Sequence, residues 1–322
     1  MNYSIVITEL LRALRGKRSQ VGLSRRLRFR FNQIYRWESG QTKIGWTDFV
    51  RLTEVVKVDL GKIIRMLRVF DHHPSEHVKL VESMIGSRKI VQIARDMKCS
   101  TSVLSRWLNG RTTPSLEQML RLMQATDQSV IQFLDAISPI EDSFPSLREK
   151  HQALKRRIEF FHCFPDATLV IRLMETDEYR RLTRYERGWF ARRLKIPIAE
   201  EKTIIETLVR LELVEMCANK PVPIVTEHIR TISTYEQRRK TDKYWQQMGA
   251  KVLDISDRPT IFSSFGYWAF SCSEEARKKV REAEHAFYQT VGNIVNTDQP
   301  ASGRSTVMAL YSQLLDLRDL IR

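Results

Sequence analysis

Apolar residues recur every three or four positions in the second 70 residues of the chain, a pattern that predicts amphipathic helices. Segments 90–97 and 101–108 each carry one apolar face, and the turn between them ends at Ser100, a residue that favours a helix N-terminus. Another helix opens at Pro114-Ser115, and the apolar residues of segment 130–134 predict one more. This part of the chain is therefore predicted to be all helical, with two short helices joined by a tight turn.

The pattern occurs twice in the chain. Alignment of the sequence with itself at an offset of 70 residues, without gaps, brings apolar positions together and also pairs identical residues. Identical pairs include Arg25 and Arg95, Arg36 and Arg106, Trp37 and Trp107, Gly40 and Gly110, Thr42 and Thr112, Arg51 and Arg121, and Leu52 and Leu122. Two copies with their own apolar positions indicate a pair of small domains, at residues 1–70 and 71–138, rather than a solenoid.

The first copy follows the same plan. Its predicted helices are Leu23 to Phe29, Phe31 to Glu38 and Trp46 to Val56, with Ser39-Gly40 as the terminator of the second. Trp37 falls on the apolar face of its helix, as Trp107 does in the second copy, so both indoles are expected in the core.

The C-terminal half begins after a break in periodicity. Residues 139–145 contain two prolines and are predicted to be a linker, so a new domain is expected over residues 146–322. Segments 185–194 and 199–211 predict two helices, and a turn at 219–221 predicts a hairpin after them.

Helix, helix and hairpin in this order are typical of a winged helix, which we place at about residues 180–226. Farther on, 260–270 and 306–310 have the composition of strands, and 274–295 predicts a long helix. The predicted fold class is mainly α: two tandem five-helix domains followed by an α+β domain with a winged-helix-like segment.

Positive charge is distributed unevenly along the chain, which points to a binding surface in the first copy. The 322-residue chain has a net charge of +15, and residues 1–70 carry 15 Lys and Arg against five Asp and Glu. The corresponding numbers are eight against seven in residues 71–140 and 30 against 26 in the remainder. A basic surface of this kind is typical of a protein that binds a polyanion, and the first copy is the main candidate for it.

Catalytic and metal-binding patterns are missing from the sequence. The four cysteines lie tens of residues apart, the histidines at 72, 73 and 77 have no third ligand in pattern, and no phosphate-binding glycine loop or serine elbow occurs. We therefore expect no metal, no cofactor and no enzymatic activity. Because no apolar run reaches the roughly 18 residues of a membrane helix and no signal peptide is recognised, a cytoplasmic protein without a membrane partner is expected.

Both copies contain residues of a known DNA-binding pattern. In the first copy these are Gln20, Leu23, Leu27, Ile34, Arg36-Trp37-Glu38 and Gly40, and in the second Ile93-Ala94, Ser100, Leu104, Arg106-Trp107 and Gly110. They resemble the lambda-repressor-like helix-turn-helix family, and the resemblance covers roughly residues 2–136. The second copy departs from the pattern where Gln is replaced by Ile90 and Glu by Leu108.

The resemblance implies roles for individual residues. Phe31, Asn32 and Arg36 fall at the family's base-facing positions together with Gln33, and Gln20 falls at its phosphate-binding helix start. Asn can bond adenine, Arg can bond guanine and Phe can touch a thymine methyl. A group of basic residues would neutralise phosphates around this helix: Arg25, Arg26, Arg28, Arg30 and Lys43.

The equivalent positions in the second copy are Thr101, Ser102 and Arg106, which are smaller and less charged but still able to form hydrogen bonds. This copy either binds DNA or serves as a dimerisation or spacer domain.

The C-terminal half is similar in the order of its elements to the C-terminal domain of a bacterial regulator family of unknown function. We expect its winged-helix-like segment to make protein contacts, because the half has a net charge of only +4 and the second helix holds Glu200, Glu201 and Glu206.

The expected function is that of a bacterial transcriptional regulator that binds specific double-stranded DNA sequences. A homodimer is expected because one helix-turn-helix unit covers few base pairs, and segment 262–270 and the helix after it are candidate interface. The alternatives are a protein-interaction module of antitoxin or assembly type that keeps the fold without binding DNA, and a nucleic-acid enzyme such as a recombinase, for which no carboxylate cluster is recognised. A small effector is unknown from the sequence.

Overall fold

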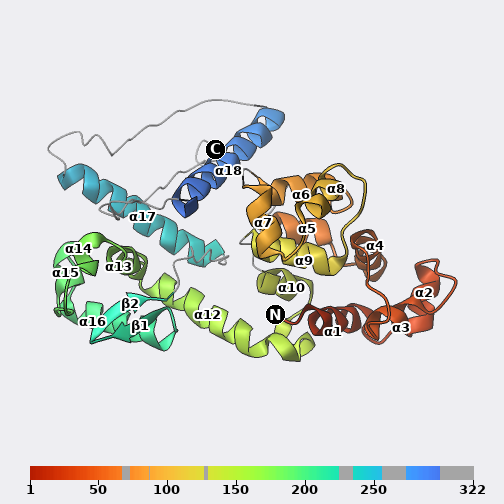
Figure 1. Cartoon of the computed structure of the whole chain (residues 1–322), viewed down its shortest axis with the longest axis horizontal. Helices are drawn as coiled ribbons and strands as arrows, with labels where there is room; N and C mark the ends of the chain where they lie inside the picture. Colours follow the sequence, from red (N-terminus) through yellow and green to blue (C-terminus); the bar gives the residue numbers. More distant parts are fainter. Residues whose placement is uncertain (67–72, 87, 127–129, 225–234, 256–272, 298–322) are drawn as a thin grey trace, which may run out of the picture. The chain divides into compact units, whose positions relative to one another are not determined.

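The computed structural model describes residues 1–66, 73–86, 88–126, 130–224, 235–255 and 273–297 (Figure 1). These residues are mainly helical and contain one small antiparallel sheet, which agrees with the predicted fold class at this level. The chain divides into two units, unit 1 at residues 1–153 and unit 2 at residues 154–322.

Unit 1 contains two sets of five helices, here called repeat 1 and repeat 2. In repeat 1 these are α1 (Tyr3–Arg15), α2 (Gln20–Arg26), α3 (Gln33–Glu38), α4 (Trp46–Val56) and α5 (Leu60–Met66). In repeat 2 they are α6 (His77–Ile85), α7 (Ile90–Asp96), α8 (Thr101–Leu108), α9 (Leu116–Ala125) and α10 (Val130–Ile137). Helices α2 and α7 have the same bounds at an offset of 70 residues, and α4 and α9 begin at equivalent positions.

Backbone conformation repeats at the same offset. Positive φ angles occur in three equivalent pairs: Gly16 and Gly86 (57° and 55°), Arg28 and Lys98 (61° and 53°), and Gly40 and Gly110 (73° and 65°). The last pair are the glycines that the sequence places after the second helix, where a left-handed residue ends a helix at low cost. The duplication predicted from the sequence is thus present in the backbone.

The start of α3 differs from the prediction. Arg28 adopts the left-handed conformation, so α2 ends at Arg26 rather than at Phe29. Helix α3 begins at Gln33 rather than at Phe31, because Asn32 is its N-cap and its Oδ1 accepts from the Tyr35 N–H at 3.2 Å. Phe31 therefore lies in the turn.

The N-cap of α8 is Ser100, as predicted, in an extended conformation. Its hydroxyl does not cap the helix, since it forms a hydrogen bond of 2.7 Å with the Ser102 hydroxyl instead. At the start of α9, Ser115 and Gln118 form a capping box, which confirms the helix predicted to open there.

The core of unit 1 is built from the apolar faces of these helices. Leu10 of α1, Phe49 of α4 and Phe133 of α10 are fully buried, and Trp37 and Trp107 are buried as the sequence predicts. Their burial is the main favourable contribution to the folding of this unit.

The predicted linker at 139–145 is wrong. This segment forms α11 (Ile140–Ser143) and leads into the 3-10 helix η1 (Pro145–Leu147), and Ile140 and Phe144 are fully buried. Both short helices contact α1, and Ser146 donates its N–H and hydroxyl to the Glu9 carboxylate. Unit 1 consequently extends beyond these residues to 153.

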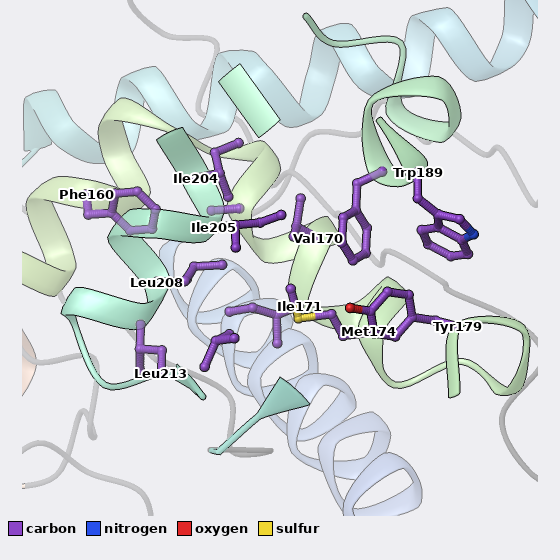
Figure 2. Close-up of a cluster of buried hydrophobic side chains, with 13 residues drawn as sticks. Phe160, Val170, Ile171, Met174, Tyr179, Trp189, Ile204, Ile205, Leu208 and Leu213 are labelled. Carbon is purple, nitrogen blue, oxygen red and sulfur yellow. The ribbon is translucent and has the colours of Figure 1, made fainter. Parts of the chain in front are cut away.

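Helix α12 (Arg148–Cys163) crosses the boundary into unit 2. The following elements are α13 (Asp166–Met174), α14 (Asp177–Arg180), α15 (Trp189–Leu194), α16 (Ile198–Arg210), β1 (Val214–Cys217), β2 (Lys220–Pro223), α17 (Tyr235–Ile255) and α18 (Glu274–Thr297). Apolar side chains from α12 to β1 form the core of unit 2 (Figure 2). In it, the rings of Tyr179 and Trp189 meet edge to face at 5.1 Å.

Strands β1 and β2 form an antiparallel hairpin in which Cys217 pairs with Lys220. Ala218 and Asn219 form the turn, both with positive φ, as in a two-residue hairpin turn. The turn therefore begins one residue before the predicted position at 219–221 and overlaps it at Asn219, and the order of two helices and a hairpin is as expected.

Helix α18 confirms the long helix predicted at 274–295. The strands predicted at 260–270 and 306–310, and with them the proposed dimer segment 262–270, lie outside the described residues. Among the helices that the structure describes, none has the length and apolar character needed to cross a membrane.

Candidate nucleic-acid interface

The turn between α2 and α3 is held by one buried hydroxyl. Ser24 Oγ accepts from the Ile34 N–H at 3.1 Å and donates to Asn32 Oδ1 at 3.3 Å. The first of these bonds satisfies a buried backbone donor at the start of α3. Ser24 thereby fixes the orientation of α3 on α2, a role that the sequence analysis did not assign to it.

A buried carboxylate ties this helix pair to α1. Glu38, which is 5% exposed, accepts from Arg15 Nε and from Gln20 Nε2, each at 2.6 Å. Charge-assisted hydrogen bonds of this kind are short and strong. The side-chain amide nitrogen of Gln20 therefore already has an acceptor within the protein. The predicted phosphate contact of Gln20 would have to come from another group of this residue.

The outer side of the turn and α3 carries exposed aromatic and basic side chains. Phe31 is 68% exposed and Tyr35 is 48% exposed, although residues of this size are usually buried. The Arg30 guanidinium lies 5.6 Å from the centre of the Phe31 ring. Arg36 is exposed next to Tyr35 in the sequence, and no ion pair within the described residues involves it.

Tyr35 is absent from the residues expected to contact DNA. Its position three residues after the N-cap of α3 places it on the open face of the helix with Arg36, a signal visible only once the start of the helix is known.

Asn32 and Gln33 are less available than the sequence suggests, because both are half-buried. Asn32 Oδ1 caps α3, and Gln33 Nε2 donates to Thr42 Oγ1 at 3.0 Å. With the cap in place, Asn32 keeps its Nδ2 donors for a base, so contact with both edge groups of adenine would require the cap to open.

Exposed basic side chains lie at the end of α2 and in the turn before α3. Arg25, Arg26, Arg28 and Arg30 are all exposed, and within the described part of the chain none of them takes part in an ion pair. Lys43 is also exposed, but its Nζ lies 2.8 Å from Glu117 Oε2. Four of the five cations predicted to neutralise phosphates therefore have no partner of opposite charge in the part of the chain that the structure describes.

The equivalent residues of repeat 2 are exposed as well. Thr101 and Ser102 lie in the first turn of α8, while Arg106 is on the same helix and donates from Nε to the Ser102 carbonyl at 3.3 Å. Because α8 begins two residues earlier than α3 does in repeat 1, Thr101 and Ser102 are helical where Phe31 and Asn32 are not.

One of the three acidic residues expected to repel phosphate on α16, Glu201, differs from the expectation. Glu201 is fully buried and accepts from the Tyr185 hydroxyl, from the Gly188 N–H at 2.7 Å and from the Ala191 N–H. It caps α15 from inside the core and presents no charge to solvent. Hydrogen bonding to this carboxylate, together with burial as the larger cause, raises the pKa of Tyr185.

Unit 2 also contains a basic segment that the expectations from the sequence do not include. Exposed cations cluster between residues 180 and 195: Arg180, Arg181, Arg184, Arg187, Arg192, Arg193 and Lys195. Of these, Arg192 lies 3.8 Å from Glu186 and Arg193 pairs with Glu178. The small net charge of the whole C-terminal half is thus a poor guide to the local charge of this surface.

No family model, curated protein or solved structure matches the chain. Inference about function therefore rests on the residues and their geometry.

Proposed function

We propose that this protein is a transcriptional regulator that binds specific double-stranded DNA sequences, and that its two repeats are helix-turn-helix domains of the lambda-repressor-like type. In this proposal α2 and α3 are the helix pair of the first domain, and α7 and α8 are that of the second.

The exposed face of repeat 1 carries the proposal. Phe31, Tyr35 and Arg36 are exposed around the start of α3, and exposed guanidinium groups without an acidic partner among the described residues lie on α2 and the turn after it: Arg25, Arg26, Arg28 and Arg30. A short helix fits the major groove of DNA, where Arg can bond guanine and aromatic carbon can touch the thymine methyl. These cations would hold the phosphates.

The polar interior of repeat 1 also supports this assignment. Glu38 fixes α3 to α1 and α2 through Arg15 and Gln20, so the base-facing residues are held on a rigid support. Such pre-organisation reduces the entropy lost on binding.

For unit 2 we propose a winged-helix-like arrangement of α13, α15, α16 and the β1–β2 hairpin, with a role in protein contacts.

A second function class fits the exposed aromatic residues, since Phe31 and Tyr35 could equally anchor a partner protein. The cluster of free arginines favours DNA, because aromatic anchors in protein interfaces do not require such a density of unpaired positive charge.

The experiment is selection of bound duplexes from a pool of random-sequence DNA by the full-length protein. The proposal predicts an enriched motif that binds about 10³-fold or more tightly than a scrambled duplex of the same length. Absence of any motif, with equal affinity for all duplexes, would contradict it and leave the protein-interaction class in its place.

A further inference from the structure

The two repeats contact each other through equivalent residues. Gly45 forms an antiparallel β-bridge with Ser115, which lies 70 positions later in the sequence. Two backbone hydrogen bonds of 3.0 Å flank the bridge: the Trp46 N–H donates to the Pro114 carbonyl, and the Leu116 N–H donates to the Ile44 carbonyl. Replacing every residue by its equivalent turns one bond into the other. The contact is reciprocal, as in the interface of a two-fold symmetric dimer.

Two pairs of helices follow the same rule: α4 contacts its equivalent α9, and α5 contacts its equivalent α10. Helix α1 also contacts α9, which is not its equivalent. In a head-to-tail arrangement, by contrast, each element would meet a different element of the other copy. A local two-fold axis therefore passes between the repeats, near Gly45 and Ser115. Ile44, Trp46, Pro114 and Leu116 are buried at this junction, which makes it part of the core of unit 1.

Resting on the proposed function, we propose that the two repeats form a pseudo-dimer within one chain, and that a single chain binds a DNA site made of two inverted half-sites. A two-fold axis between two helix-turn-helix domains relates their base-facing helices by the same rotation that relates the halves of an inverted DNA sequence. In this arrangement helix α3 contacts the bases of one half-site and α8 contacts those of the other.

The two half-sites differ in sequence because the two helices differ in side chains. Phe31 is replaced by Thr101, Asn32 by Ser102 and Tyr35 by Ser105. The base-facing arginine is shared, since Arg36 and Arg106 are equivalent and both exposed. The DNA site is consequently an imperfect inverted repeat, in which one G·C pair occurs in both halves and the other contacted positions differ.

A second copy of the chain is not needed for this recognition. The reason to expect a homodimer was that one helix-turn-helix domain covers too few base pairs, and the paired repeats remove that reason.

The test uses full-length wild type, Arg36→Ala and Arg106→Ala in parallel selections from random 30-base-pair duplexes. Wild type is expected to enrich an imperfect inverted repeat, and each variant is expected to lose the guanine preference in a different half while keeping the other half. Each substitution should weaken binding to the wild-type duplex by about 5- to 150-fold. Sedimentation of that duplex with saturating protein should show one chain per site.

A second measurement tests the rigid coupling of the repeats. Insertion of five base pairs between the half-sites turns one of them to the opposite side of the duplex. The affinity should then fall to that of a duplex with one half-site. A motif with a single half, a normal motif for Arg106→Ala, two chains per site, or indifference to the insertion would overturn the pseudo-dimer while leaving DNA binding intact. Failure to enrich any motif would instead remove the proposed function.

Discussion

At the scale of residues, equivalent interior positions of the two repeats hold side chains of different chemistry. Three polar residues that meet inside repeat 1 are each replaced by an apolar residue at the equivalent position of repeat 2: Arg15 by Ile85, Gln20 by Ile90 and Glu38 by Leu108. A buried ionic group can often be exchanged for apolar residues of similar volume, provided that all partners change together. The repeats show both alternatives within one chain.

This exchange gives a prediction for stability. Glu38→Leu alone leaves the Arg15 guanidinium without its carboxylate and should destabilise unit 1 by about 3 kcal/mol. The triple variant Arg15→Ile, Gln20→Ile and Glu38→Leu copies repeat 2 and should recover most of that loss. Hydrogen exchange of the α2 and α3 amides in the full-length protein measures both effects.

The sharpest comparison is between the two variants. A triple variant that exchanges as fast as Glu38→Leu would show that the polar group of repeat 1 has a role that apolar packing cannot replace.

At the scale of elements, the sequence pattern predicts most helices of unit 1 but not how their ends are set. The duplication makes α2 and α7 recognisable, because equivalent apolar positions define one face in both. The pattern alone puts the start of α3 two residues too early, because Asn32 is compatible with a continuing helix and becomes the N-cap only through its bond to Tyr35.

The predicted linker failed for a physical reason. Pro139 and Pro145 break the apolar periodicity, but they stand at the N-cap of α11 and the first position of η1, where proline is tolerated. Ile140 and Phe144 between them reach the core. No sequence pattern near Gly45 or Ser115 predicts the bridge between them, because this bridge depends on how the two folded repeats pack against each other.

Unit 2 offers a prediction at this scale, because Glu201 caps α15 from inside the core. Glu201→Ala leaves the Gly188 and Ala191 N–H groups without an acceptor and should destabilise unit 2 by about 3 kcal/mol. Glu206, on the same helix, is exposed and lies 3.7 Å from Lys202, so Glu206→Ala should change stability by less than about 0.5 kcal/mol. Thermal denaturation of both variants checks this, and equal losses would contradict the capping role.

At the scale of the whole of unit 1, the stability of the junction between the repeats is expected to depend on pH. Lys43, the larger influence, and Arg121 hold the pKa of Glu117 below its ordinary value of 4.5. A lowered folded-state pKa means that the contribution to stability is full above the ordinary pKa and is lost as the pH falls through the folded value. The gain is below about 1 kcal/mol because Lys43 is largely exposed.

Glu117→Gln should therefore be less stable than wild type at pH 7, and the difference should shrink as the pH falls below 4.5 toward pH 3. The protection of the Trp46 and Leu116 amides, which join the repeats, reports the difference directly. A difference of the same size at both pH values would mean that the ion pair is not its source.

From the charge distribution we propose that repeat 1 holds the DNA phosphates, and this is the central claim about the molecule. Residues 1–70 have a surplus of ten positive charges, and five of their arginines lie in the α2–α3 segment, where Arg25, Arg26, Arg28 and Arg30 have no acidic partner among the described residues. Each phosphate contact releases counterions and steepens the dependence of affinity on salt.

A salt titration of wild type, Arg28→Ala and Lys57→Ala on one selected duplex tests this claim most directly. Arg28 and Lys57 are exposed cations of repeat 1 with left-handed backbones, at φ 61° and 67°, so alanine leaves the same backbone strain in both. Lys57 ends α4, outside the α2–α3 pair. Arg28→Ala should flatten the slope of log K against log salt by about 0.9, and Lys57→Ala should leave it unchanged. Equal slopes for all three proteins would contradict the account.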